Sequence, residues 1–221
     1  FQPGAVLADG TPDNPGLEKY RIFKYRKGET VEQEAVDQGA PATVIGDEML
    51  FCVYNDMQSD TRVFNSAPLG VEVQQRVSAW YGTGGTGHVM LVSYRVINKS
   101  PEPIDSLYIG MGNDPDIGSA NDDLGGLDRD YNMYFAYNGD GNDPDYGVDV
   151  PALGVSIIKG LTRESGVSGN AAGGSEDAGH QAPMGMTAGF VFTCGSALYN
   201  TSDPGNSEEV FNVCRGRDIK G

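Results

Sequence analysis

The sequence has few basic residues and no long apolar run, and each shortage excludes a class of protein. Fifteen Lys and Arg stand against 31 Asp and Glu, which gives a formal net charge of −16. Nucleic acids and anionic membrane surfaces are bound through clustered positive charge, so this balance argues against both as partners. No apolar run approaches the roughly 18–20 residues that span a bilayer, and we therefore expect no membrane insertion.

Cysteine is also scarce, with three in the chain. Cys52 lies in an apolar run, where a free cysteine usually behaves as a small buried hydrophobe. Cys194 and Cys214 each end an apolar segment and are candidates for a disulfide, but the pairing stays open because connectivity does not follow from sequence. None of the three has the spacing of a zinc site.

Turn-forming residues are abundant instead. Gly (32) and Pro (12) make up about a fifth of the 221 residues, which is typical of a chain of short strands and turns. A phase shift in the apolar alternation at Gln74-Gln75 suggests a β-bulge. The strand-like segments are 20–25, 48–54, 71–81, 88–97, 104–111, 131–137, 153–158 and 186–193.

These segments follow one another without helices between them, which indicates an all-β fold, mostly an antiparallel β-sandwich, with long Asp/Gly-rich loops. Residues 1–40 are predicted as an irregular segment with an edge strand at 20–25 and a polar linker at 26–40. Residues 41–221 are predicted as a single domain. It contains a mobile loop at 166–179 and one short C-terminal helix at 207–215, capped by Asn206 or Ser207.

The segment 113–149 holds much of the negative charge. It contains ten Asp, no Glu, no Lys and one Arg, Arg129, so its net charge is −9. Close carboxylate pairs repel one another by about 1 kcal/mol each even in water. A bound cation would offset this repulsion, and Ca²⁺, which takes oxygen ligands from irregular loops, fits best.

Two clusters of oxygen ligands stand in this segment, joined by the predicted strand 131–137, which could bring both to one end of the sandwich. Neither cluster matches the EF-hand spacing. The alternative interpretation is that these Asp and Asn residues are simply turn formers. The candidate calcium ligands are Asp114, Asp116, Asn121, Asp122, Asp123 and Asp128 in the first cluster, and Asp140, Asn142, Asp143 and Asp145 in the second.

Signals for catalysis are weak. The two histidines, His88 and His180, are far apart, and no Gly-x-Ser-x-Gly nucleophile motif occurs. Carboxylates are so numerous that a pair suited to glycoside hydrolysis carries little information. The sequence therefore favours a protein that is not an enzyme, although it leaves the question open, and it predicts no catalytic residue.

Several strings of the sequence are distinctive when taken together. They include Ile45 to Asp56, Pro68 to Gln75, Tyr94 to Ser100, Asn113 to Gly118, Asn121 to Leu124, Tyr137 to Asp140, Pro151 to Gly154 and Glu208 to Asn212. As a set they resemble a family of large secreted bacterial proteins, mostly unannotated and often ending in a type IX secretion sorting domain, and the similarity extends over nearly the whole chain. The resemblance implies secretion or surface display, a β-rich modular architecture and an interior position of this chain in a longer polypeptide. Leu127 stands where relatives tend to have cysteine.

The leading hypothesis is a secreted or cell-surface, calcium-binding structural or adhesive module, part of a surface layer or filament, without catalytic activity. Its expected partners are other copies of itself, neighbouring modules of the same polypeptide, or a glycan. The alternative is an accessory or catalytic module of a secreted hydrolase that degrades polysaccharide or protein. Self-assembly by exchange of a strand between copies is a third hypothesis.

Overall fold

The computed structural model describes residues 1–58, 64, 66–160, 162–164, 181–183, 185–192 and 203–221. Its internal contacts divide the chain into two compact units, Phe1–Ser106 and Leu107–Gly221. The sequence instead predicts one domain over 41–221 preceded by an irregular segment. Residues 1–40 in fact belong to the first unit, because their strands pair with a strand that follows them.

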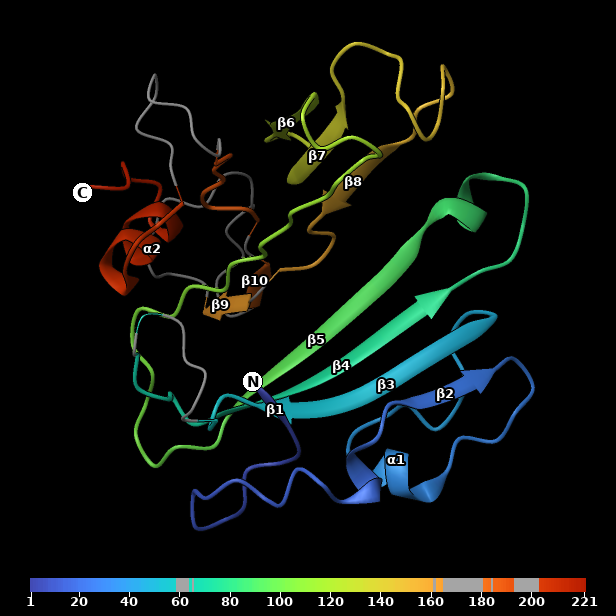
Figure 1. Ribbon diagram of the computed structural model, residues 1–221. Coiled ribbons are helices and arrows are strands. Elements are labelled where there is room, and N and C mark those ends of the chain that lie inside the picture. Colours follow the sequence, from blue (N-terminus) through green and yellow to red (C-terminus); the bar gives the residue numbers. More distant parts are fainter. Residues whose placement is uncertain (59–63, 65, 161, 165–180, 184, 193–202) are drawn as a thin grey trace. The chain divides into compact units, whose positions relative to one another are not determined.

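The first unit is built on an antiparallel sheet (Figure 1). Its long strands are β3 (Glu48–Asn55), β4 (Val71–Ala79) and β5 (Met90–Asn98), which pair in that order. The far side of β3 is shared by β1 (Gln2–Pro3) and β2 (Phe23–Arg26). Among the described strands β4 alone pairs with β5, so β5 forms one edge of this sheet.

The hydrophobic core of the first unit lies between one face of the sheet and the short helix α1 (Gln33–Asp37) (Figure 1). Alternate residues of β3 are buried on this face, as expected for a strand with period two. The predicted polar linker at 26–40 is therefore wrong in part, since it contains α1 and contributes to the core. The core residues are Phe23, Tyr25, Val31, Ala35, Ala40, Met49, Phe51 and Val53.

The pairing of β3 with β4 differs from the prediction, because it contains no bulge. The register between β3 and β4 runs residue for residue from Glu48↔Ala79 to Asn55↔Glu72, so the predicted bulge at Gln74-Gln75 is wrong. The short 3-10 helix η3 (Gly85–His88) lies in the β4–β5 connection, and another, η1 (Glu18–Tyr20), precedes β2.

The second unit contains a three-stranded antiparallel sheet, with β7 (Met133–Asn138) between β6 (Asp123–Asp128) and β8 (Ala152–Ser156). A separate pair joins β9 (Thr162–Glu164) to β10 (Gln181–Pro183). The predicted C-terminal helix is present as α2 (Ser207–Cys214), capped by Asn206, whose side chain accepts a hydrogen bond from the Glu209 N–H at 3.0 Å.

The all-β fold class is thus confirmed, with antiparallel sheets and one short C-terminal helix, and the sandwich arrangement stays a prediction. The predicted strands at 104–111 and, over its described part, 186–193 are wrong, because these stretches are irregular. Pro101 and Pro103 precede the first stretch, and Ser106 within it has a positive φ of 56°, which a strand does not allow.

Three predictions fall outside the described residues: the loop at 166–179, His180 and Cys194. Cys214 and Cys52 are free cysteines in the described part of the chain. Among these same residues, no helix is long and apolar enough to cross a membrane.

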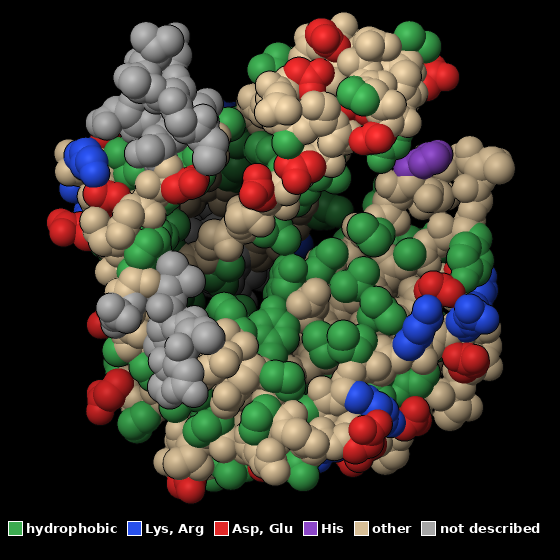
Figure 2. All heavy atoms as spheres, viewed as in Figure 1, with side chains coloured by type: hydrophobic (Ala, Val, Ile, Leu, Met, Phe, Trp, Pro, Cys, Tyr) green, Lys and Arg blue, Asp and Glu red, His purple; other side chains and the backbone are tan. Residues whose placement is uncertain are grey.

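Charge is distributed differently in the two units. The first holds nine Lys and Arg against fourteen Asp and Glu, and the second holds six against seventeen. In Figure 2, acidic side chains stand around β7 and β8 without basic ones beside them, whereas both signs adjoin near β2. The ion pairs of the first unit include Arg26–Glu48 and Lys27–Asp47.

Candidate functional site

The Asp-rich segment is held together by bonds between side chains and backbone. Asp143 is 2% exposed, and its two carboxylate oxygens accept hydrogen bonds from three N–H groups. The Ser119 N–H donates at 2.7 Å, the Asp145 N–H at 2.7 Å and the Tyr146 N–H at 2.9 Å. These N–H groups stabilise the ionised form and lower the pKa of Asp143 below its usual 3.8.

A glycine makes this arrangement possible. Gly118 has a φ of 71°, a left-handed conformation that glycine adopts without strain, and a Cβ atom at this position would overlap the carboxylate of Asp143. The backbone of residues 117–119 is therefore in close contact with Asp143, and this contact joins the segment that contains the first Asp cluster to the second cluster.

Asp122 and Asp123 lie at the start of β6 on the same segment of backbone. Asp123 Oδ2 accepts a hydrogen bond from the Ile117 N–H at 2.8 Å, and Asp122 Oδ2 accepts one from Asn138 Nδ2 at 2.8 Å. The other oxygen of each carboxylate, Oδ1, is buried without a hydrogen-bond partner. A buried carboxylate oxygen without a donor is destabilising unless a cation or ordered water is present.

The structure thus bonds Asp123 and Asp143 to the backbone of residues 117–119, and it bonds Asp122 to the buried Asn138, which sequence reasoning missed. Asn138 Oδ1 accepts hydrogen bonds from the N–H groups of Asp140 and Gly141, so it shapes the turn after β7.

The other predicted ligands lie apart from this network or remain at the surface. Asp128 is at the opposite end of β6, about 17 Å along the strand from Asp123, and caps the turn to β7 by accepting from the N–H groups of Asp130 and Tyr131. No group of three or more His, Cys, Asp or Glu side chains is arranged to hold a metal ion in the part of the chain described. The exposed candidates are Asp114, Asp116, Asn121, Asp140, Asn142 and Asp145.

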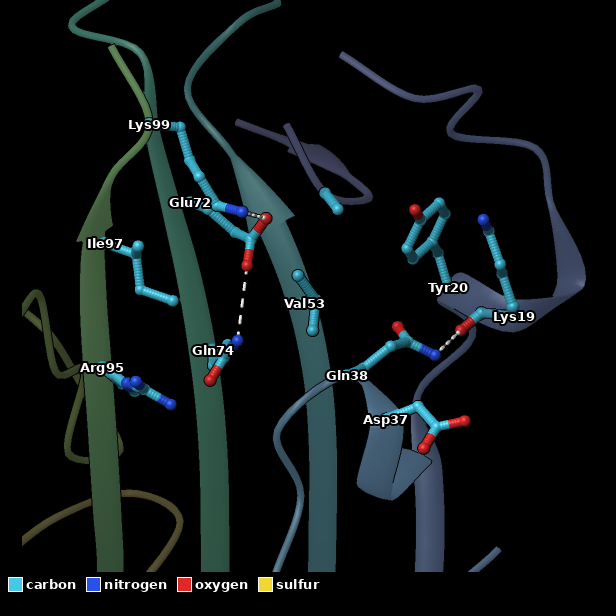
Figure 3. Close-up of a pocket in the computed structure, with 11 residues that line it drawn as sticks. Lys19, Tyr20, Asp37, Gln38, Val53, Glu72, Gln74, Arg95, Ile97 and Lys99 are labelled. Carbon is cyan, nitrogen blue, oxygen red and sulfur yellow. Dashed lines mark hydrogen bonds and ion pairs between the residues drawn. The ribbon is translucent and has the colours of Figure 1, made fainter. Parts of the chain in front are cut away.

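The first unit has a cavity of about 360 Å³ on the face of the sheet that α1 partly covers (Figure 3). Its walls are polar where β4 and β5 contribute. Glu72, 4% exposed, accepts a hydrogen bond from the Val6 N–H at 3.1 Å and from Gln74 Nε2 at 3.3 Å, and it forms an ion pair with Lys99 at 3.5 Å. The remaining lining residues are Ala5, Lys19, Tyr20, Asp37, Gln38, Val53, Arg95 and Ile97.

On the η1 side of the cavity, Lys19 forms an ion pair with Asp13 at 2.8 Å, and the Tyr20 hydroxyl donates to the same carboxylate at 2.8 Å. The Lys19 ammonium and the tyrosine hydroxyl together lower the pKa of Asp13 to about 2. Lys19 and Lys99 therefore both have carboxylate partners within the protein.

Comparison with known proteins gives no match, since no protein-family model, curated protein or solved structure is significantly similar to this chain. The candidate sites are therefore interpreted from their own geometry.

Proposed function

We propose that this chain is an extracellular, non-catalytic β-rich module with a structural or adhesive role, and that Ca²⁺ binds at the Asp-rich end of its second unit. The observation that carries the calcium proposal is the pair of buried carboxylate oxygens without donors, Asp122 Oδ1 and Asp123 Oδ1. Backbone carbonyls and water would complete the six to eight oxygen ligands that Ca²⁺ takes.

The charge balance supports the same proposal. Residues 113–149 carry ten Asp and one Arg. Two of these carboxylates, Asp123 and Asp143, bind the backbone of residues 117–119, and Asp122 is next to Asp123 in the chain. Ca²⁺ binding would reduce repulsion among them and would stabilise the folded state by mass action.

The test is a thermal melt with Ca²⁺, with Mg²⁺ and with NaCl of equal ionic strength. At a calcium concentration about a hundredfold above Kd, the folded state gains about 2.7 kcal/mol, so the melting temperature rises by several degrees. The double variant Asp122→Asn/Asp123→Asn loses this gain, whereas the exposed control Asp145→Asn keeps it. An equal rise with NaCl alone would mean charge screening and would refute the calcium site.

Association between copies is a second element of the proposed structural role, and the edge strand β5 supports it. Its nine residues contain one charged side chain, Arg95, and no proline, so the edge lacks the usual protection against pairing. Suppose that the β5 strands of two copies pair antiparallel, with Tyr94 opposite Tyr94. Val92 of one copy then faces Val96 of the other, and Arg95 faces Ser93 of the other, so the two arginines are not opposite each other.

Sedimentation equilibrium tests this association. We expect a concentration-dependent dimer that Val92→Lys abolishes, because a charge on the edge opposes pairing, while Lys at the exposed position Val148 has no effect. A strictly monomeric profile of the unmodified chain at all concentrations would contradict the association and leave the calcium proposal unaffected.

The alternative function, a module of a secreted hydrolase acting on polysaccharide or protein, is supported by the two carboxylates that line the cavity, Asp37 and Glu72. Both oxygens of Glu72 are engaged by Val6, Gln74 and Lys99, which favours a positioning role over proton transfer. A panel of chromogenic substrates separates the two functions: turnover that Asp37→Asn abolishes would establish the hydrolase, and retention without turnover supports the binding module.

A further inference from the structure

A straight segment without a partner strand lies in the second unit. Residues 107–117 contain no turn or bend, and Figure 1 draws them as an extended yellow-green trace. Residues 107–114 are exposed, and their backbone N–H and C=O groups make no hydrogen bond with any residue that the structure describes. Further along the chain, the Ile117 N–H donates to Asp123. Residues 107–114 thus have an extended backbone whose hydrogen-bonding groups are open to another chain.

One side of segment 107–114 lies against helix α2. The ring of Tyr108 meets the ring of Phe211 edge-on, with centroids 5.4 Å apart. Two residues later, a Cβ atom at Gly110 would lie 3.8 Å from Cys214 Sγ. Helix α2 therefore supports the segment from the side of Tyr108 and Gly110.

The other side of the segment carries an apolar row. In an extended chain alternate side chains point to the same side, so Leu107, Ile109 and Met111 point away from Tyr108 and Gly110. These three side chains are 38%, 53% and 50% exposed. An exposed apolar row beside unpaired backbone groups is the surface to which an added strand binds, because its backbone supplies hydrogen bonds and its alternate side chains supply apolar contacts.

The charge of this region selects the strand that fits. From Leu107 to Leu127 the chain has four Asp and no basic residue. Two of them, Asp114 and Asp116, stand at the end of the segment, and Pro115 between them has no N–H to continue the pairing. A basic end on the added strand gains attraction there, whereas a second copy of this chain brings the same acidic segment.

We propose that segment 107–114 binds an extended peptide of another protein as an added antiparallel β-strand. This peptide has apolar side chains at alternate positions and basic residues at its N-terminal end, which lies opposite Asp114 and Asp116. Eight residues of strand span about 26 Å. One added strand buries less surface than a stable protein interface, so binding is weak and reversible.

This inference gives the proposed adhesive role a class of partner, and it is independent of the calcium site and of β5. The calcium proposal depends on Asp122 and Asp123, and the association of copies depends on β5. Neither involves segment 107–114, so either can fail while peptide binding is observed, and the reverse also holds.

The experiment is a titration of the full chain with the synthetic peptide KKTVTVTV in the presence of a calcium chelator, followed by NMR. We expect saturable shifts of the amides of residues 107–114, and these amides should become protected from hydrogen exchange as they form strand bonds. The peptide EETVTVTV should bind about fivefold more weakly or less tightly still, because its acidic end faces Asp114 and Asp116.

A pair of double variants tests the role of the backbone. Met111→Pro/Gly112→Pro removes two neighbouring N–H groups, one from each edge of the segment, and should weaken binding of KKTVTVTV about tenfold or more. Met111→Ala/Gly112→Ala is the matched control, because it keeps both N–H groups and Gly112 has open space around it. The melting temperature should be unchanged in both, since these N–H groups make no hydrogen bond with a described residue.

Four results would overturn the proposal. They are no saturable binding of KKTVTVTV, equal binding of the acidic peptide, an equal loss of affinity in the two double variants, and shifts without protection of the segment's amides. Sedimentation equilibrium adds a further test. Association of the unmodified chain that the proline double variant abolishes would assign the segment to a second copy and would also contradict the proposal.

Discussion

The two units of this chain are stabilised in different ways. Among the described residues, the first unit buries twelve apolar side chains and the second buries three: Ile117, Ala136 and Ile219. The second unit instead relies on carboxylates and amides that bind backbone N–H groups of its loops. An acidic sequence with little apolar material can therefore still fix long loops, through hydrogen bonds that depend on ionised carboxylates.

One device is common to both units. In the first, Asp56, 6% exposed, accepts hydrogen bonds from the N–H groups of residues 69, 70 and 71 at the end of the β3–β4 connection. In the second, Asp143 accepts from three N–H groups in the same manner. The difference is that Asp56 adjoins a sheet with a large apolar core, whereas Asp143 is itself one of the main buried side chains of its unit.

The largest effect is expected from the apolar core of the first unit. Phe51, 2% exposed, packs against Phe23 with ring centroids 6.5 Å apart. Phe51→Ala should reduce the free energy of unfolding of the first unit by about 3–5 kcal/mol, measured by urea denaturation. The control Tyr137→Ala removes a 42% exposed ring of the second unit and should have a much smaller effect. Equal losses would contradict the difference between the units.

A glycine substitution tests how closely the second unit is packed around its carboxylate. Gly118→Ala places a Cβ against Asp143, whereas Gly141→Ala, at a similar φ of 74°, has open space around it. The control should lose about 1–2 kcal/mol from backbone strain alone, and Gly118→Ala should lose clearly more. If denaturation gives equal losses, the contact between segment 117–119 and Asp143 is absent in solution.

Acid should affect the second unit through Asp143. Its pKa is lowered in the folded state, so its contribution to stability is present above the unfolded value of 3.8 and is lost as the pH falls through the lower folded value. Thermal melts at decreasing pH should show this loss below pH 3.8. Asp143→Asn should start from a lower melting temperature, and its curve should be flatter in this range; an unchanged slope would exclude Asp143 as the titrating group.

The smallest effect is expected from the exposed ion pairs of the first unit. Arg21 pairs with Glu32 and Glu34 and lies over the Phe23 ring at 4.1 Å. Exposed pairs contribute little and are screened by salt. Arg21→Met, which retains apolar cover for the ring, should change the melting temperature by a few degrees at most and should make it less dependent on salt. A large loss at high salt would show that the pairs act as part of the core.

The strands with clear apolar alternation could be predicted from the sequence, and β3, β4, β5, β7 and β8 lie close to the predicted segments. The segments that failed are those in which tertiary contacts override local pattern. β6 reads DLGGLD and has almost no strand-forming residues, yet it pairs along its whole length with β7. Helix α1 has five residues, too few for a helical pattern to be recognised, and its segment was predicted as a polar linker although Val31 and Ala35 pack in the core.

The Asp-rich network could be predicted in part from the sequence, whereas the cavity of the first unit could not. The density of Asp indicated the loop network, but composition could not distinguish Asp143, which is buried, from Asp145, which is exposed two residues later. The polar cavity was not predicted, because Gln38, Gln74 and Arg95 come together only through the register of β4 with β5 and the position of α1.

The central claim, that carboxylate-to-backbone bonds stabilise the second unit and an apolar core the first, is tested most directly by amide hydrogen exchange at neutral pH and in acid below the folded pKa of Asp143. The account predicts that the amides of Ser119, Asp145 and Tyr146, which donate to Asp143, lose their protection factors at the lower pH. The amides of β3 should retain theirs. Protection that falls equally in both units, or that persists at Ser119, would contradict the account.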